Sequence, residues 1–319
     1  MSETFELSGK RIWVAGHRGM VGSAIARALR ARGDCEVITV SRSEIDLLRQ
    51  AEVETWMEKV RPEAVFLAAA RVGGIMANST RPAEFLYQNL MIEANIIHAA
   101  HSTDVEKLLF LGSSCIYPKL AAQPMREDAL LTGPLEPTNE WYAIAKIAGI
   151  KMCDAYRKQY GRHFISAMPT NLYGPNDNFD PVASHVLAAL MRKIHDAKKA
   201  GAATVEIWGT GSPLREFMHV DDLASACIFL MERYDQAGHI NVGHGEEVTI
   251  RALAEQIANV AGYQGAFHFD TTKPDGTPRK LMDSTALRSL GWTARIGLED
   301  GIRNAYGWFE ANQAALRAA

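Results

Sequence analysis

Residues 11–22, RIWVAGHRGMVG, carry the strongest structural signal in the chain. The first five residues form a short β-type run, and Gly16, Gly19 and Gly22 follow with the spacing G-x-x-G-x-x-G. The segment after them repeats apolar residues at helical spacing until Gly33 ends the pattern. Strand, glycine turn and helix in this order predict the first βα unit of a dinucleotide-binding sheet.

The glycine turn indicates what this unit binds. Glycine lets the backbone bend sharply and approach a pyrophosphate, while free N–H groups and the positive end of the helix dipole attract that anion. Three glycines in an ordinary tight turn are the alternative, but the position at the first strand-to-helix junction favours cofactor binding. We therefore expect the whole turn to contact the cofactor: Gly16, His17, Arg18, Gly19, Met20, Val21 and Gly22.

The end of the second expected strand, residues 36–40, indicates which dinucleotide binds. NAD-binding proteins carry an acidic residue there for the ribose 2′-hydroxyl, whereas this chain has Arg42 close by. A guanidinium attracts a 2′-phosphate, and Arg18 in the glycine turn supplies a second one. The pattern favours NADP over NAD, although Glu44 or Asp46 could still reach a ribose hydroxyl.

Alternating elements continue along the chain from this unit. Apolar runs at 64–70 and 107–112 are typical of strands buried on both faces, and helical periodicity covers 50–60 and 82–101. The rhythm βαβαβαβ requires a parallel sheet with right-handed crossovers. We therefore predict an α/β fold with a Rossmann-type doubly wound parallel sheet.

The pattern loosens in the second half of the chain. A helix near 182–199 and several short strands follow, and 273–280, KPDGTPRK, is typical of a loop before two last short helices. We expect residues 1–174 to form an NADP-binding domain, with returning segments near 215–245. Residues 175–319 should form mainly a smaller α/β substrate lobe.

The composition narrows the class of protein. The 319 residues are 47% hydrophobic and 22% charged, which allows a full core, and the net charge is -3 without any block of like charge. We expect neither nucleic acid nor a membrane as partner. Four dispersed cysteines and no expected signal peptide or membrane span favour a cytoplasmic protein. His98 and His101 lie one helical turn apart, but no third ligand follows, so we predict no metal site.

Tyr142 and Lys146 stand four residues apart in a predicted helix, so both side chains lie on one face. A free phenol has a pKa of about 10, and a neighbouring ammonium should lower that pKa toward neutrality. Ser113, at the end of a predicted strand, would bind a substrate carbonyl and stabilise its oxyanion. The three side chains together indicate carbonyl chemistry, whereas the spacing alone also fits an ordinary surface helix.

Eight stretches of the chain together resemble the extended short-chain dehydrogenase/reductase family, and they extend over nearly its whole length. They are GHRGMVGSAI, AARVGGI, NLMIEANIIHAAH, LGSSCIYPK, PTNEWYAIAKIAGIK, PTNLYGPNDNFD, WGTGSPLREFMHVDDLA and KPDGTPRK. The similarity is strongest to the members that convert GDP-4-keto-6-deoxy-D-mannose to GDP-L-fucose. The resemblance implies an NADPH-dependent homodimer that epimerises C3 and C5 of this GDP-sugar and then reduces its 4-ketone.

The resemblance also implies roles for individual residues. Ser113, Tyr142 and Lys146 would carry out the reduction, and Cys115 and His185 would form the acid/base pair of the epimerisation. Residues near the cofactor would be Leu111, Gly112, Lys146, Pro169, Thr170, Asn171, Leu172 and His185. Residues at the nucleotide-sugar would be Lys193, Trp208, Arg215 and Asp275.

These roles agree with the chemistry of the side chains. A ketone acidifies the hydrogens on both adjacent carbons, so inversion needs a base on one face and an acid on the other. The thiol of Cys115 and the imidazole of His185 both titrate within reach of neutral pH. Trp208 offers a stacking face for a base, and Arg215 offers a forked donor for a diphosphate. The alternative for each of the four is a structural role in packing or helix capping.

Other functions on the same architecture compete with an epimerase-reductase. A 4-epimerase would hold NAD tightly, and a 4,6-dehydratase would need carboxylates after the strand-end serine, where this chain has Ser114 and Cys115. A non-catalytic dinucleotide sensor would keep the glycine turn but would not need the tyrosine, lysine and serine. The residues therefore favour the epimerase-reductase over these alternatives.

Overall fold

A computed structural model describes residues 4–180, 184–273 and 275–315. A parallel six-stranded sheet forms its larger part, in the order β2-β1-β3-β4-β5-β9. The strands are β1 Arg11–Ala15, β2 Glu36–Ile38, β3 Ala64–Leu67, β4 Lys107–Leu111, β5 His163–Pro169 and β9 His239–Val242. The strand order reverses between β1 and β3, which is where doubly wound sheets bind their ligands.

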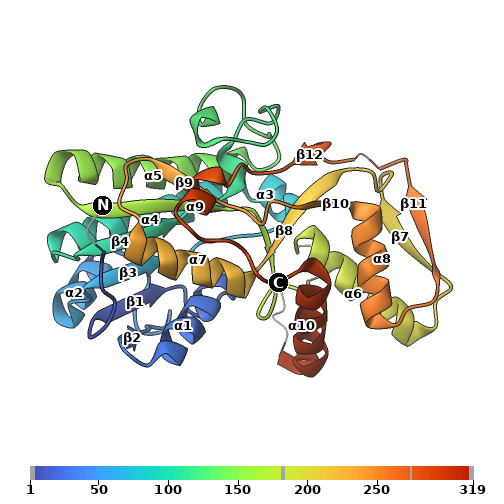
Figure 1. Cartoon of the computed structure of the whole chain (residues 1–319), viewed down its shortest axis with the longest axis horizontal. Helices are drawn as coiled ribbons and strands as arrows, with labels where there is room; N and C mark the ends of the chain where they lie inside the picture. The colour runs from blue at the N-terminus through green and yellow to red at the C-terminus, as the bar shows by residue number, and fades with distance from the viewer. Residues whose placement is uncertain (1–3, 181–183, 274, 316–319) are drawn as a thin grey trace.

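Helices cover both faces of this sheet because its strands bury residues on both sides. In β1, Ile12 and Val14 pack into one apolar cluster, and Trp13 and Ala15 pack into another. The first cluster lies under α1 (Met20–Arg32) and α7 (Val220–Arg233), and the second under α2 (Gln50–Val60), α4 (Pro82–Ser102) and α5 (Glu140–Tyr160) (Figure 1). The predicted doubly wound parallel sheet is confirmed.

A smaller lobe lies at the other end of the molecule (Figure 1). It holds the sheet β10-β8-β12, to which β6 adds, the β7/β11 pair, and a third apolar cluster between α6, α8 and α10. The bounds are β6 Asn171–Tyr173, α6 Val186–Ala200, β7 Thr204–Trp208, β8 Leu214–His219, β10 Glu247–Thr249, α8 Ile250–Ala261, β11 Ala266–Asp270, β12 Arg279–Lys280 and α10 Leu298–Ala311. The remaining helices are α3 Ile75–Thr80, α9 Thr285–Ser289 and the 3₁₀ turns η1 Ser114–Ile116, η2 Glu127–Ala129 and η3 Gln313–Ala315. No helix within the described ranges is both long and apolar enough to cross a membrane.

The smaller lobe departs from the sequence-based prediction in three places. Helix α6 begins at Val186 rather than near 182, and residues 181–183 lie outside the described part of the chain. The last two residues of KPDGTPRK form β12, because they pair with β8, a contact that local turn signals do not reveal. Helix α10 is 14 residues long, not short, since its apolar residues recur at helical spacing.

Candidate active site

The residues expected at the cofactor and at the ketone come together at the carboxyl edge of the large sheet. The glycine turn follows β1, Ser113 follows β4, and residues 169–172 lie at the end of β5. Neighbouring parallel strands end at the same edge, so these three segments come together. Tyr142 and Lys146 reach the same edge from α5, which contacts η1 directly after Ser113.

The glycine turn is built to accept a pyrophosphate. Gly16 has φ +89°, and a Cβ there would come within 2.7 Å of the backbone of Ala69. A Cβ on Gly22 would meet the carbonyl of Gly16, so the first turn of α1 packs directly on the loop. Gly19 is the N-cap residue of α1, which therefore has no side-chain cap, and the first turn of the helix contains no acidic residue. Its positive end is therefore available to an anion, which fits the pyrophosphate of a dinucleotide.

The segment after β2 fits a 2′-phosphate better than a free ribose. Arg18 and Arg42 are both exposed at this end of the sheet. The carboxylate of Glu44 accepts hydrogen bonds from the Ser41 amide at 2.8 Å and from the Ser41 hydroxyl at 2.6 Å. The Glu44 carboxylate is thus occupied by hydrogen bonds within its own turn. Of the two carboxylates that could have bound a ribose hydroxyl, Glu44 and Asp46, the first is therefore already paired.

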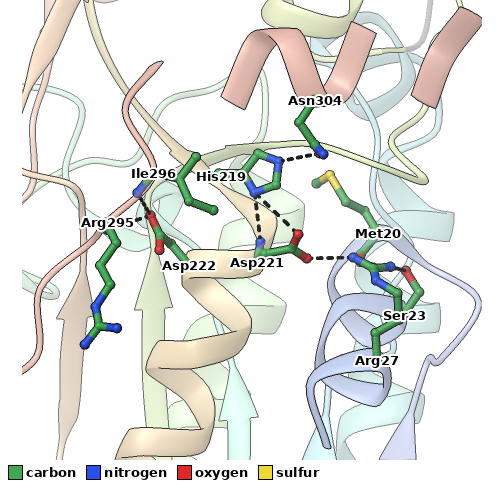
Figure 2. A network of polar contacts seen from close by, with 9 residues as sticks. All are labelled: Met20, Ser23, Arg27, His219, Asp221, Asp222, Arg295, Ile296 and Asn304. Carbon is green, nitrogen blue, oxygen red and sulfur yellow. Dashed lines mark hydrogen bonds and ion pairs between the residues drawn. The ribbon is translucent and has the colours of Figure 1, made fainter. Parts of the chain in front are cut away.

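A polar network ties α1 to the smaller lobe (Figure 2). Arg27 on α1 donates to the carboxylate of Asp221 at 2.6 Å and to the hydroxyl of Ser23 at 3.3 Å. His219 accepts from the Asp221 amide through Nδ1 at 3.2 Å and lies 3.1 Å from Oδ1 of Asn304 on α10 through Nε2. Burial lowers the pKa of His219, so the ring is neutral and donates from Nε2. The helix that would hold the cofactor is therefore anchored to the start of α7 and to α10.

Ser113, Tyr142 and Lys146 form a polar group at the end of β4, in which the lysine is buried and the serine and tyrosine are half-buried. The phenol of Tyr142 interacts with the Ser113 side chain. The ammonium of Lys146 donates to the carbonyl of Leu111 at 3.0 Å and lies 2.8 Å from the carboxylate of Glu93 on α4. These three groups are suited to carbonyl chemistry: a hydroxyl, a phenol, and a cation whose position is fixed by Leu111 and Glu93.

The expected direction of the pKa shift at Tyr142 is wrong. Burial raises the pKa of the phenol well above its usual value, and the charges of Cys115 and Glu93 add to that rise. Burial disfavours a phenolate, and the Glu93 carboxylate offsets the ammonium that was expected to stabilise it. Tyr142 is thus a protonated phenol at neutral pH, which suits proton donation to a ketone.

Cys115 and His185 both interact electrostatically with Lys280. Cys115 is 7% exposed, and burial raises the pKa of its thiol, while the Lys280 ammonium opposes that rise. His185 is the N-cap residue of α6, but its side chain makes no capping hydrogen bond and is accessible. Desolvation and the charge of Lys280 lower the pKa of its imidazole. Both candidate acid/base groups therefore interact with one lysine of β12.

The strand end 169–172 is held in place by the large sheet and by β8 of the smaller lobe. The Thr170 amide donates to the carbonyl of Val242 at 3.1 Å, and the Asn171 side chain donates to the carbonyl of Glu216 at 2.8 Å. A Cβ on Gly112 would meet the side chain of Met168 on the neighbouring strand. These contacts give the expected nicotinamide-binding edge a fixed backbone.

The residues expected at the nucleotide-sugar lie farther along the smaller lobe. Trp208 is 56% exposed at the end of β7, and the ammonium groups of Lys193 and Lys273 each lie 5.7 Å from the centre of its ring system. Arg215 projects from β8 toward the loop of Asp275. The Asp275 carboxylate accepts from the amide and hydroxyl of Thr210 at 2.9 and 2.8 Å, so it orders the loop after Trp208.

Two residues of this region were not expected from the sequence. Glu93 lies in the middle of α4, where a carboxyl among apolar residues was the available signal. Lys280 lies opposite Arg215 in the β8/β12 pairing, and neither cation has a carboxylate within 4.0 Å among the described residues. Lys280 belongs to the quoted KPDGTPRK stretch, but a position next to the thiol requires the fold.

Comparison with known proteins agrees with this geometry. Residues 12–243 match the model of the NAD dependent epimerase/dehydratase family. The chain is 60% identical to GDP-L-fucose synthase 1 of Arabidopsis thaliana, over 98% of this chain and 97% of that protein. It is 57% identical to GDP-L-fucose synthase of Escherichia coli K12, over 98% of this chain and 100% of that protein.

A solved structure gives the same result. A GDP-L-fucose synthetase from Naegleria fowleri, bound to NADP, matches with a TM-score of 0.92 and 27% sequence identity. The match covers 100% of this chain and 99% of that one. The chain therefore belongs to the NAD dependent epimerase/dehydratase family.

Proposed function

We propose that this chain is an NADPH-dependent epimerase-reductase that converts GDP-4-keto-6-deoxy-D-mannose to GDP-L-fucose. One observation carries the proposal: a half-buried phenol, a strand-end hydroxyl and a thiol interact with one another at the edge of the sheet where the glycine turn lies. Relatives named GDP-L-fucose synthase, at 57% and 60% identity, support the same activity. A 4,6-dehydratase is less well supported, because uncharged Ser114 and Cys115 follow Ser113 where elimination needs carboxylates.

NADP is the cofactor of this reaction. The glycine turn would hold its pyrophosphate, Arg18 and Arg42 its 2′-phosphate, and Lys146 with the strand end 169–172 its nicotinamide half. In its reduced form the bound cofactor supplies the hydride for C4 of the sugar. The remaining steps belong to side chains of this chain.

In the reduction, Ser113 and Tyr142 act on the oxygen of the 4-ketone. The Ser113 hydroxyl donates a hydrogen bond to that oxygen, and the Tyr142 phenol gives it a proton as the hydride reaches C4. The ketone becomes an alcohol, and the phenolate that is left takes a proton from solvent. The ammonium of Lys146 lies 5.8 Å from the centre of the Tyr142 ring. Its hydrogen bond to the Leu111 carbonyl fixes its position beside the phenol.

In the epimerisation, Cys115 and His185 are the base and acid. A base removes the proton next to the ketone, the carbonyl carries the charge as an enolate, and an acid returns a proton to the opposite face. Repeating this at C3 and C5 inverts both centres. Lys280 supports the pair because its charge favours a thiolate at Cys115.

The GDP part of the substrate would bind along the smaller lobe. The exposed face of Trp208 suits stacking with guanine, and Lys193 and Arg215 supply positive charge for the diphosphate. Asp275 would act through the loop that it orders beside Trp208.

A homodimer through α4 and α5 is the assembly that we propose. Tyr87 on α4 is 59% exposed and Trp141 on α5 is 42% exposed, while the two helices pack side by side. Exposed aromatic side chains on neighbouring helices are typical of a helical interface. Tyr87→Lys should convert a dimeric molar mass in light scattering to a monomeric one, and an unchanged mass would contradict this interface. All four cysteines are free thiols, which supports a cytoplasmic location.

NADPH consumption tests the proposed function. The purified protein should oxidise one NADPH for each GDP-L-fucose formed from GDP-4-keto-6-deoxy-D-mannose and should prefer NADPH to NADH. No oxidation contradicts the activity, and equal rates with both cofactors contradict the assignment of NADP.

Arg42 provides a sharper test of cofactor choice. Arg42→Ala should lower kcat/KM for NADPH about tenfold and leave NADH unchanged, because one charge-assisted contact to the 2′-phosphate is lost. Arg303→Ala, at an exposed position on α10, is the matched control. If Arg42→Ala keeps the wild-type ratio of kcat/KM for NADPH to kcat/KM for NADH, Arg42 does not contact the 2′-phosphate.

A further inference from the structure

Strand β8 lies at the junction of the two lobes and carries a fully buried carboxyl group. Figure 1 shows β8 between the large sheet and helix α8 of the smaller lobe. Glu216 of β8 is 0% exposed, and it directly follows Arg215, which is expected at the diphosphate. Successive side chains of a strand point to opposite faces, so the carboxyl group of Glu216 lies behind the face of β8 that carries Arg215.

Backbone amides of two other segments donate to this carboxyl group. The Gly245 amide donates to Oε1 at 2.7 Å, and the Met282 amide donates to Oε2 at 3.1 Å. Gly245 lies between β9 of the large sheet and β10 of the smaller lobe. Met282 lies two residues after Lys280, between β12 of the smaller lobe and α9, which contacts β9. One side chain therefore binds two segments that cross from one lobe to the other.

The backbone of Glu216 binds a third crossing segment, the one from β5 to β6. Its carbonyl accepts from the Asn171 side chain at 2.8 Å and from the Thr170 hydroxyl at 3.5 Å. These two residues belong to the edge that is expected to contact the nicotinamide. Glu216 thus connects this edge to Arg215, its neighbour in β8.

The packing around the carboxyl group leaves no space for a side chain at residue 243. A Cβ on Gly243 would lie 2.5 Å from Oε1 of Glu216 and 2.7 Å from the hydroxyl of Ser284. Ser284 is 1% exposed and belongs to the same crossing segment as Met282. The segment after β9 approaches the carboxyl group this closely because Gly243 has no side chain.

The hydrogen bonds of Glu216 are those of a carboxylate, because each of its two oxygens accepts an amide hydrogen. Burial raises the pKa of the carboxyl group, and the amides of Gly245 and Met282 oppose that rise. A glutamine at this position would turn its NH₂ group toward one of the two amides. That amide would then be buried without an acceptor, which weakens the junction.

We propose that Glu216 is a positioning residue that holds the two lobes in the alignment needed for the reaction: it joins three crossing segments and so fixes Arg215 relative to the nicotinamide-binding edge 169–172. The proposal rests on the proposed function for the identity of the substrate. The junction itself does not, because all of its hydrogen bonds lie within the chain.

Glu216→Gln separates alignment from ligand binding. NADPH would contact mainly the large lobe and GDP mainly the smaller one, so the Kd of each, measured by calorimetry, should stay close to the wild-type value. The kcat/KM for GDP-4-keto-6-deoxy-D-mannose should fall about 10- to 100-fold, because a small misplacement of bound substrate slows a reaction by this much. Deuterium exchange and NADPH oxidation should fall together, since both steps need the aligned sugar.

A merely stabilising role would give a different result. Glu216→Gln would then unfold at a lower temperature, but its rates per folded molecule would equal those of the wild type. Glu246→Gln is the matched control, because its carboxylate is 84% exposed and directly follows Gly245. This control should keep both the wild-type kinetics and the wild-type unfolding temperature.

A double-mutant cycle tests whether Glu216 acts through Arg215. Arg215→Ala should raise the KM of the keto sugar by a larger factor in the wild type than in Glu216→Gln, because the guanidinium is already misplaced in that background. In Glu246→Gln, Arg215→Ala should have its full effect.

Gly243→Ala repeats the test without removing a charge. The added Cβ should displace the Glu216 carboxylate, so turnover of the keto sugar should fall while NADPH and GDP still bind. This variant also carries the test if Glu216→Gln does not fold.

Three results would overturn the role of Glu216. The first is a wild-type kcat/KM in folded Glu216→Gln or Gly243→Ala, or a loss of NADPH and GDP binding together with activity. The second is a cycle in which the effects of Glu216→Gln and Arg215→Ala simply multiply. The third needs no variant: Gly245 and Met282 amides that exchange with deuterium oxide as fast as exposed loop amides contradict the junction outright. Failure of the wild type to convert the keto sugar contradicts the proposed function instead, and leaves the exchange result standing.

Discussion

At the scale of single residues, the two chemistries of the proposed reaction depend on different atoms. Tyr142 and Ser113 interact with each other at the end of β4 and would act on the ketone oxygen. Cys115 and His185 interact with Lys280 from separate segments and would act on the neighbouring carbons. Because the groups are distinct, a mutation can remove one step and leave the other.

Tyr142→Phe should lower NADPH oxidation by about a thousandfold or more, since a proton donor is lost, while exchange of solvent deuterium into the keto sugar continues. Cys115→Ser should chiefly lower that exchange, because a hydroxyl is a far weaker base than a thiolate. Mass spectrometry of the keto sugar and NADPH absorbance measure the two steps.

The matched controls are Tyr160→Phe, at an exposed position of the same helix, and Cys35→Ser, at a half-buried cysteine beside α1. Both controls should keep both activities. Equal loss of the two steps in Tyr142→Phe and in Cys115→Ser would show that the division of labour is wrong.

The sequence predicted the placement of Tyr142 and Lys146 but not the pKa of the phenol. The spacing of Tyr142 and Lys146 places them on one helix face, as α5 shows. The direction of the phenol pKa could not be predicted, because Glu93 reaches Lys146 from another helix, 53 residues away in the chain. Residue spacing predicts which side chains are neighbours on one helix. The pKa of the Tyr142 phenol depends instead on its burial and on a carboxylate from α4, which spacing along α5 does not reveal.

At the scale of elements, the junction of β1 and α1 depends on the absence of one side chain. Gly22→Ala should lower the free energy of unfolding by about 1–3 kcal/mol and weaken NADPH binding at least tenfold, because the added Cβ would overlap the Gly16 carbonyl and the His17 amide. Thermal unfolding and NADPH fluorescence measure the two effects.

Gly297→Ala is the control for this substitution. Gly297 precedes α10 with φ −63°, and a Cβ there would meet nothing within 4 Å. This variant should bind NADPH and unfold like the wild type. A Gly22→Ala protein that does the same would contradict the close packing of helix and turn.

The elements of the large sheet could be predicted because each carries its own signal. Apolar runs and helical periodicity gave β3, β4, α2 and α4 close to their observed bounds. Strand β12 could not be predicted, since Arg279 and Lys280 become a strand only by pairing with β8. The same pairing places Lys280 near Cys115, so the missed strand and the missed site residue have one cause.

At the scale of the whole molecule, a buried histidine makes stability depend on pH. His239 on β9 is 8% exposed and lies 2.9 Å from the Tyr117 hydroxyl, and burial lowers the pKa of its ring to about 4. The unfolded chain, with an ordinary histidine pKa of about 6.5, binds more protons between these two values. The contribution is therefore fully present above pH 6.5 and is lost as the pH falls toward 4.

His239→Gln removes this pH dependence and keeps an amide donor for Tyr117. The wild type should lose roughly 2 kcal/mol more stability than the variant between pH 8 and pH 5, measured by urea unfolding at each pH. His268→Gln, at a position on β11 in the smaller lobe, is the control and should follow the wild type. Parallel stability curves for wild type and His239→Gln would contradict a neutral buried ring.

The most direct test of the whole account is one reaction in deuterium oxide with unlabelled NADPH. The account predicts GDP-L-fucose that carries deuterium at C3 and C5, from acid/base exchange, and ordinary hydrogen at C4, from the hydride. Nuclear magnetic resonance of the product reads all three positions at once. A product with hydrogen at C3 and C5, or with deuterium at C4, would contradict an epimerase-reductase.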